Sequence, residues 1–383
     1  MTVETTLRCT VREWLNRVAG NSMSKSQHLL LGFVFREWLL TIAVLGLLLS
    51  SLYLGSVPTY TLDEITPLFF LLVLFVVVRG IERSGLISRL GTRLEKGRFL
   101  PARLVIITFF LSMFLTIDVS LVTMIPLVLS LNIRQRSNLV ILVALTAHVG
   151  AALMPFGTPQ NLFIFSFYGV DPHDFIVAIA PFSVGMLAVF LACSLLIRPT
   201  SGTATVAGER RLEVRSAVAY GLLLVLVVLC IFRVLPPQAA LVAIAYPLLF
   251  DRRSLAVDYV LLATFLCFIG LAGNAGEIIG RVLEHPHHVF ILSVGLSQVI
   301  SNVPTTLLLT EFTDHWQALL WGTNVGGFGS PVAAMANLIA YRLYASHANS
   351  ENTASFMIRF IIAGYLTLMV GVGLFMLWRL FWN

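Results

Sequence analysis

Polar residues interrupt two long apolar stretches of this chain, and each interruption combines glycine, proline and oxygen-bearing side chains. The first reads Gly157-Thr158-Pro159-Gln160-Asn161, and the second reads Gly326-Gly327-Phe328-Gly329-Ser330-Pro331. Because proline lacks an N–H group and glycine permits unusual dihedral angles, each segment is expected to break a helix. The freed carbonyl groups of a broken helix can bind a cation, whereas the N-terminus of a half-helix attracts an anion. Packing kinks without a ligand are the alternative.

Asp118 is the one acidic residue deep inside an apolar segment, and no basic residue lies near it in the sequence. An isolated carboxylate is unfavourable by several kcal/mol in such a place. We therefore expect Asp118 to bind a cation such as Na+ or to carry a proton. The alternative is a structural carboxylate that accepts backbone N–H groups at the tip of a hairpin.

A second polar group surrounds Pro304 and consists of Ser297, Gln298, Ser301, Asn302, Thr305 and Thr306. Its hydroxyl and amide groups donate and accept hydrogen bonds without carrying charge. Such groups suit a small polar or anionic solute and an ion held by oxygen atoms. One or two of these side chains are expected only to satisfy freed backbone groups.

The histidines and cysteines give weaker indications. His148 lies with Thr146 on the stretch that leads to Gly157, where an imidazole either carries a proton or forms an interhelical hydrogen bond. The run His285-Pro286-His287-His288 is expected to be a solvated loop rather than a metal site, because no cysteine or helical spacing supports one. The four cysteines show no disulfide or metal pattern, and no cofactor is expected other than a possible Na+ ion.

The composition places these residues in a lipid environment. Of the 383 residues, 58% are hydrophobic and 11% are charged, whereas about a quarter of the residues in soluble domains are charged. A soluble fold is therefore excluded. An all-α polytopic membrane protein is predicted, since helices satisfy their own backbone groups in a lipid bilayer. The net charge of +6 is attributed to cytoplasmic loops and does not imply nucleic acid as a partner.

Nine apolar stretches are counted as membrane spans on their length and composition. They are 38–56, 64–80, 138–169, 175–197, 216–235, 238–250, 257–276, 315–343 and 356–380. Two others, 103–131 and 289–312, are predicted to be re-entrant hairpins. An arm of about 14 residues covers only about 21 Å of a hydrocarbon core that is about 30 Å thick.

The basic residues orient these spans. If residues 1–35 form a cytosolic arm, nine crossings place the C-terminus outside the cytoplasm. Of the 25 basic residues, only Arg233, Arg281 and Arg379 then lie outside. This asymmetry is typical of membrane proteins, and it predicts a multi-pass protein of the inner (cytoplasmic) membrane with a cytoplasmic N-terminus.

Three short matches in the same order suggest an internal repeat: 79–85 with 270–276, 116–120 with 300–304, and 157–159 with 329–331. An odd number of predicted crossings separates the two halves, so the second repeat is expected to be inverted. The predicted units are the arm 1–35, a first repeat 36–197, a linker and connecting span 198–237, and a second repeat 238–383.

Common enzyme motifs are absent from the sequence. It contains no GxxxxGK[ST], HExxH or GxSxG segment. We therefore expect neither ATP-driven pumping nor enzymatic activity, and an ion gradient or the solute's own gradient would drive any transport.

Four segments resemble the ion transporter superfamily: 114–119, 157–161, 295–304 and 324–329, of which 295–304 is the most specific. That superfamily includes divalent anion–sodium symporters, citrate transporters, arsenite efflux permeases and some sodium–proton antiporters. The chain is most similar to bacterial inner-membrane anion permeases, over nearly its whole length from about residue 38.

The resemblance implies a secondary active transporter that moves a small organic or inorganic anion together with Na+ or H+. It also implies an elevator movement against a scaffold that forms a homodimer. The implied substrate ligands are Thr116, Thr158, Asn161, Ser301, Asn302, Thr305 and Thr306. The implied ion ligands are Asp118 and Gly157 at a first site, and Asn302, Gly329 and Ser330 at a second.

Two departures from the superfamily pattern affect the expected solute. The second hairpin tip reads Ser301-Asn302-Val303 where relatives have Ser-Asn-Thr, and the first reads Thr116-Ile117-Asp118 where relatives often have asparagine in the middle. A negative charge beside an anion favours a bound cation, and it counts against a dicarboxylate as substrate. The alternatives are an arsenite efflux permease, a Na+/H+ antiporter and, in a different class, a membrane sensor or scaffold without flux.

Overall fold

The computed structural model of the chain describes residues 37–86, 99–131, 133, 135–197, 213–279, 283–347, 350 and 352–382. The regular secondary structure in these ranges is entirely helical, as the composition predicts. The predicted cytosolic arm 1–35 and the basic residue Arg281 lie outside the described residues.

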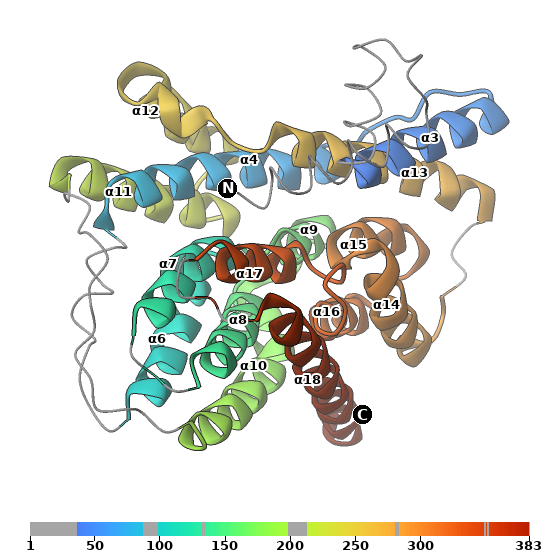
Figure 1. Ribbon diagram of the computed structural model, residues 1–383. Helices are drawn as coiled ribbons and strands as arrows, with labels where there is room; N and C mark the ends of the chain where they lie inside the picture. The colour runs from blue at the N-terminus through green and yellow to red at the C-terminus, as the bar shows by residue number, and fades with distance from the viewer. Residues whose placement is uncertain are drawn as a thin grey trace, which may run out of the picture.

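The helices form two layers, which lie one above the other in Figure 1. The upper layer consists of α3 (Trp38–Leu54), α4 (Leu62–Arg83), α11 (Val214–Ile231), η2 (Pro237–Leu241), α12 (Val242–Phe250), η3 (Arg252–Leu255) and α13 (Tyr259–Ile279). Within it, α3 packs along α13 and α4 packs along α11.

The lower layer contains two groups of helices in the same order: a pair of helices, a broken helix and a long helix. The first group is α6 (Leu100–Phe114), α7 (Ile117–Ser130), α8 (Arg136–Ala152), α9 (Pro159–Phe167) and α10 (Pro172–Leu195). The second group is α14 (Pro286–Ile300), α15 (Asn302–Leu309), η4 (Thr310–Phe312), α16 (Trp316–Gly326), α17 (Met335–Ser346) and α18 (Thr353–Trp382). The two groups also pack against each other: α7 of the first contacts α17 of the second, and α9 of the first contacts α15 of the second.

Local sequence explains where several helices begin. At the start of α4 the backbone N–H of Thr61 donates to the carboxylate of Glu64 over 2.6 Å, which forms part of a capping box. Asp63 and Glu64 also place negative charge in the first turn, where the helix dipole favours it. Pro172 opens α10 at a position whose N–H would have no partner inside the helix.

Five described segments are long and apolar enough to cross a membrane: α4, α10, α11, Arg252–Ile278 and α18. The chain is therefore a multi-pass, all-α membrane protein. The predicted spans 138–169 and 315–343 each consist of two shorter helices, because the polar segments interrupt them. The predicted span 238–250 corresponds to the short pair η2 and α12. The total of nine crossings and their orientation remain predictions.

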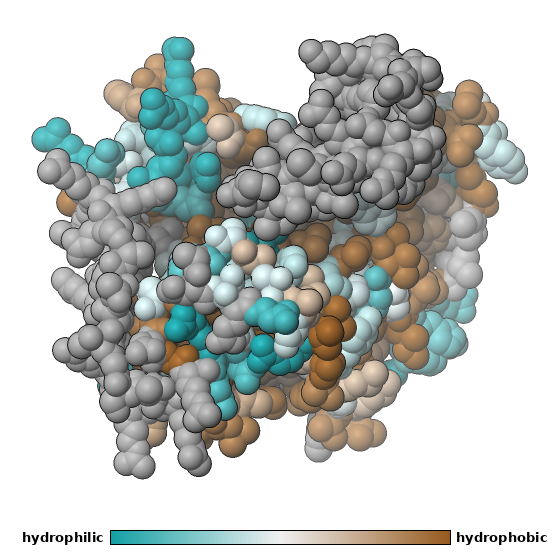
Figure 2. All heavy atoms as spheres, in the orientation of Figure 1, coloured by the Kyte–Doolittle hydropathy of each residue, from teal (hydrophilic) through white to brown (hydrophobic). Residues whose placement is uncertain are grey.

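The exposed surface suits a lipid environment. Large hydrophobic side chains are exposed on α3 and α18, among them Leu49 (67%), Leu52 (78%) and Leu366 (64%). In Figure 2 hydrophobic residues lie along the right and lower edges of the face shown, while hydrophilic residues collect at its middle and its upper left. An apolar exterior of this extent matches contact with lipid chains.

The two predicted hairpins are present as the helix pairs α6–α7 and α14–α15, and their entry into a membrane from one side remains a prediction. Their tips share a rare backbone conformation: Thr116 has φ 143° and ψ 163°, and Ser301 has φ 76° and ψ 156°. For residues other than glycine this conformation is unfavourable by about 1–3 kcal/mol. By backbone conformation, Thr116 of the first hairpin corresponds to Ser301 of the second. This register differs by one residue from the sequence match, so Asp118 corresponds to Val303 instead of Asn302.

Each hairpin lies close against the first half of the broken helix in its own group. A side chain at Gly150 of α8 would collide with the carbonyl of Phe109 on α6. In the same way, a side chain at Gly322 of α16 would collide with Ser293 on α14. Only glycine permits such close contact between helices, and its use at corresponding places supports the proposed repeat.

Candidate binding site at the two helix breaks

The first break separates α8, which ends at Ala152, from α9, which begins at Pro159. The last carbonyl groups of a helix have no partner within it. Here the side-chain Nδ2 of Asn161 donates to the carbonyl of Ala152 over 2.9 Å. A side chain at Gly157 would collide with the carbonyl of Ala151, so the turn requires glycine. The predicted break is therefore present, and Asn161 holds its two halves together.

The second break lies between Gly326 and Met335 and repeats this arrangement. Asn337 is the third residue of α17, as Asn161 is the third residue of α9. Its Nδ2 donates to the carbonyl of Gly327 at 3.0 Å and to that of Ser330 at 3.1 Å. Gly329 has φ 97°, a value that disfavours other residues.

Gln298 fastens the second hairpin to the second break. Its Nε2 donates to the carbonyls of Gly326 (2.6 Å) and Phe328 (3.0 Å), and its Oε1 accepts the backbone N–H of Ser330 at 3.0 Å. At the tip itself, the backbone N–H of Asn302 donates to the carbonyl of Ala333 over 2.9 Å. The hairpin tip and the break therefore form one connected unit.

The two breaks meet through a pair of asparagines. The Nδ2 of Asn324 on α16 donates to the Oδ1 of Asn161 on α9 over 2.8 Å, and also to the carbonyl of Leu320 at 2.8 Å. Both asparagine side chains are fully buried. The polar segments that lie far apart in the sequence thus share one buried centre.

His148 adds an imidazole to this centre. Its ring lies 5.0 Å from the ring of Phe328, measured between centroids. A side chain at Gly327 would collide with the His148 Nε2 and would also come close to the Nδ2 of Asn302. His148 on the first broken helix is therefore in contact with the second break.

Several buried polar atoms around the breaks have no hydrogen-bond partner among the described residues. They are both ring nitrogens of His148, Thr158 Oγ1, Gln160 Nε2 and Asn324 Oδ1. An unpaired buried donor or acceptor is unfavourable by about 1–3 kcal/mol, so such atoms mark places where water, an ion or a solute binds. Together they offer both donors and an acceptor.

Asp118 is half-buried on the first turn of α7, next to the strained Thr116. Its carboxylate forms no hydrogen bond and no salt bridge with the residues that the structure describes, so it does not cap the hairpin tip there. No bond joins Asp118 to Gly157 within these ranges. The first ion site, and the role of Thr116 as a substrate ligand, remain predictions.

The predicted ligands of the second hairpin divide into two kinds. The hydroxyl groups of Thr305 and Thr306 donate to the carbonyls of Ser301 and Asn302, at 2.8 and 2.9 Å, and so satisfy the backbone as one alternative predicted. Ser301 Oγ donates to Ala333 at 3.3 Å, next to the strained tip. A separate case is Ser330, whose Oγ donates to the carbonyl of Gln298 at 3.1 Å.

Thr146 and the three histidines of 285–288 are the remaining polar residues that the sequence analysis considered. Thr146 Oγ1 donates to the carbonyl of Leu142 at 2.7 Å. The rings of His285, His287 and His288 contact one another, and the described residues include no group of three or more His, Cys, Asp or Glu side chains that could hold a metal ion.

Sequence reasoning did not include Asn324 or Gln160 among the substrate and ion ligands, and it placed Gln298 only in the general polar group around Pro304. The available signal was an amide side chain within a few residues of a helix break in an otherwise apolar helix. The equivalent positions of Asn161 and Asn337 were a second signal, visible only once the first residue of each half-helix is known.

Two hairpins and two broken helices that surround buried polar atoms define the class of polytopic membrane transporters. A sequence model of the citrate transporter family matches residues 30–321, and the chain belongs to that family. It is 30% identical over 330 residues to an uncharacterized transporter of Methanocaldococcus jannaschii, an alignment that covers 81% of this chain and 89% of the relative. It is 31% identical over 294 residues to the inner membrane protein YbiR of Escherichia coli K12, covering 70% of this chain and 77% of that protein.

Proposed function

We propose that the chain is a secondary active transporter that moves a small anion across the cytoplasmic membrane together with Na+ or H+. The observation that carries this proposal is the group of unpaired buried polar atoms around the Asn161–Asn324 contact. Membership of the citrate transporter family supports transport as the activity, and the inner-membrane name of one relative supports the location.

The chemistry of the centre favours an anion of low charge. The N-termini of α9 and α17 lie at the breaks without a side-chain cap, so their positive ends are free to attract an anion. Gln160 Nε2 and the Thr158 hydroxyl add donors. No lysine or arginine occurs in 146–162, 297–306 or 320–338, so a more highly charged anion would need a bound cation.

Asp118 is the proposed site of that cation. Its carboxylate has no salt-bridge partner among the described residues and lies at a strained hairpin tip. Na+ bound there, or a proton carried there, would offset the negative charge while the anion is bound. We further propose that the lower layer moves as a unit against the upper layer in a homodimer, with the N-terminus cytoplasmic and the C-terminus outside.

Uptake into proteoliposomes tests coupling. A solute found by screening anions for thermal stabilisation in Na+ and K+ buffers would be supplied with an imposed Na+ gradient, a pH gradient or neither. We expect accumulation to require one gradient and to be lost in Asp118→Asn, because the amide neither binds Na+ tightly nor carries the proton.

Asp174→Asn is the matched control, since Asp174 lies exposed at the start of α10 and its carboxylate lies 3.1 Å from the Nδ1 of its neighbour His173. This variant is expected to accumulate solute as the wild type does. Accumulation that ignores both gradients and survives Asp118→Asn would refute the coupling proposal.

The same centre also suits a second function, exchange of Na+ for H+ or efflux of arsenite. The carboxylate of Asp118 has no partner among the described residues, and no basic residue lies around the breaks in the sequence; both features favour a cation or an uncharged oxyacid over a polyanion. Acidification of the vesicle lumen on addition of Na+, or arsenite flux without an anion requirement, would select this function instead.

A further inference from the structure

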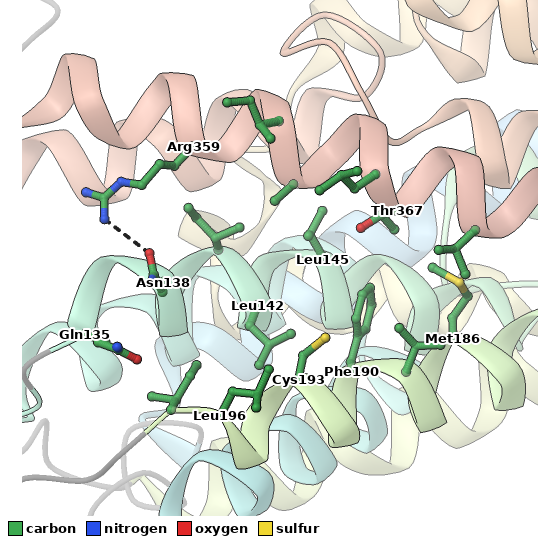
Figure 3. Close-up of a pocket in the computed structure, with 17 residues that line it drawn as sticks. Gln135, Asn138, Leu142, Leu145, Met186, Phe190, Cys193, Leu196, Arg359 and Thr367 are labelled. Atoms are coloured by element: carbon green, nitrogen blue, oxygen red, sulfur yellow. Dashed lines mark hydrogen bonds between the residues drawn. The ribbon is translucent and has the colours of Figure 1, made fainter.

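A groove of about 600 Å³ lies between α8, α10 and α18, and none of the residues that line it belongs to the two helix breaks. Its walls are mainly apolar and include Leu142, Leu145, Phe190 and Leu366. Figure 3 shows Leu142, Leu145 and Phe190 between the helices, with the polar residues Gln135, Asn138 and Arg359 at one end. The volume lies within the range of about 300–1,000 Å³ that is typical of ligand sites.

The polar end carries the positive charge of Arg359, which has no carboxylate partner among the described residues. There the Nη1 of Arg359 donates to the Oδ1 of Asn138 over 3.2 Å, and its Nε donates to the carbonyl of Ser355 at 3.3 Å. The side chain of Gln135 does not cap α8, so the first-turn N–H groups of that helix add to the positive potential.

We propose that this groove binds one anionic phospholipid, with its phosphate at Arg359 and the N-terminus of α8 and one acyl chain along α8, α10 and α18. An apolar groove that opens to the membrane fills with an acyl chain, and its basic end selects a lipid with a negative headgroup. The polar end lies on the predicted cytoplasmic side, where anionic lipids impose a negative surface potential. The proposal does not depend on the transported solute.

The first experiment compares headgroups on the purified full chain by native mass spectrometry. Dioleoyl phosphatidylglycerol and dioleoyl phosphatidylcholine have the same chains, so they differ only in the headgroup, which is anionic in the first lipid and zwitterionic in the second. We expect one retained phosphatidylglycerol and no comparable retention of phosphatidylcholine. In Arg359→Gln the apparent affinity for phosphatidylglycerol should fall about fivefold, the loss expected when the attraction of one basic residue is removed.

Arg342→Gln is the matched control, because Arg342 is an exposed arginine on α17 that does not line the groove. It should retain phosphatidylglycerol as the wild type does. Equal retention of both lipids by the wild type, or equal loss in Arg359→Gln and Arg342→Gln, would overturn the proposal.

The second experiment needs no charge change. Cys193 lines the groove and is exposed, whereas Cys230 is buried. In detergent, phosphatidylglycerol should slow maleimide alkylation of Cys193, as followed by peptide mass mapping, and phosphatidylcholine should not. Ala363→Phe places a large side chain in the groove and keeps Arg359. This variant should no longer retain phosphatidylglycerol. Alkylation of the wild type at the same rate with either lipid would overturn the proposal even if the variant fails to fold.

Discussion

One hydrogen bond, from Asn324 to Asn161, joins the two helix breaks, and its environment explains why both residues are amides. A buried amide can donate to one neighbour and still present an oxygen to a ligand. Asn161 uses its Nδ2 on Ala152 and its Oδ1 on Asn324, while the Asn324 Oδ1 remains without a described partner. Asn161 thus closes the break, and Asn324 presents the free acceptor.

Replacing Asn324 by alanine tests this division of roles. The variant loses the bonds to Asn161 and Leu320 and leaves buried partners unpaired, so we expect destabilisation of about 1–3 kcal/mol in detergent. Transport should fall by at least about tenfold, the effect of some 1.4 kcal/mol on a rate. Thermal unfolding and proteoliposome uptake would measure the two effects.

Asn274→Ala serves as its control in the upper layer. Asn274 is also buried, and its Nδ2 donates to Ser50 Oγ and Ser51 Oγ over 2.9 and 3.0 Å. Its loss should lower stability by a similar amount and leave transport largely intact. Equal loss of transport in the two variants would show that the breaks have no special role.

The hairpins combine a strained tip with a tightly packed arm. Thr116 and Ser301 adopt a backbone that glycine would adopt more readily, yet both positions carry a hydroxyl group. Gly150 and Gly322 let each hairpin lie directly on its broken helix. Strain that is retained at both tips and supported by close packing points to a function for the two hydroxyl groups.

Paired substitutions at Thr116 separate strain from chemistry. Thr116→Ala keeps the strain and removes the hydroxyl group, whereas Thr116→Gly removes both. We expect Thr116→Gly to be about 1 kcal/mol more stable than Thr116→Ala, because the relief of strain exceeds the extra entropy of glycine in the unfolded chain. Both variants should transport poorly. A glycine variant that is less stable than the alanine variant would contradict the strained conformation.

The sequence predicts these elements better than it predicts their contacts. The glycine and proline content of 157–161 and 326–331 identifies both breaks, and apolar length with basic flanks identifies the first hairpin. The register of the tips differs from the sequence match by one residue, because a strained backbone at Thr116 and Ser301 leaves no pattern in residue type. The Asn324–Asn161 bond was not predictable, since it depends on how α16 and α9 approach each other.

At the level of the whole chain, the two layers pack against each other along α4 and α9 and along α13 and α15, and they also touch where α11 and α9 end. Arg233 of the upper layer has φ 61°, and its Nη1 donates to the carbonyl of Gly169 in the lower layer over 3.1 Å. Its guanidinium also lies 5.5 Å from the ring centroid of Phe165. A movement of one layer against the other must break these contacts.

A cross-link between the layers tests that movement. Ser166 and Arg233 line the same pocket of about 670 Å³, so cysteines placed at both positions should react with one short, cleavable bis-maleimide. With the native cysteines replaced by serine, the linked protein should still bind solute and should lose uptake. Cleavage of the linker should restore uptake, and Ser166→Cys alone should be unaffected. Full uptake by the linked protein would argue against movement between the layers.

The contacts between the two groups of helices in the lower layer affect the order in which the protein can fold during synthesis. Asn161 is synthesised 163 residues before Asn324, its hydrogen-bond partner. At translation rates of about 5–20 residues per second, this separation amounts to roughly 8–30 s. During that interval α7 lacks α17, α9 lacks α15, and the polar atoms of the first break must find temporary partners in the membrane or its insertion machinery. The two halves look like separate units in the sequence, but neither can complete its fold before the other has been inserted.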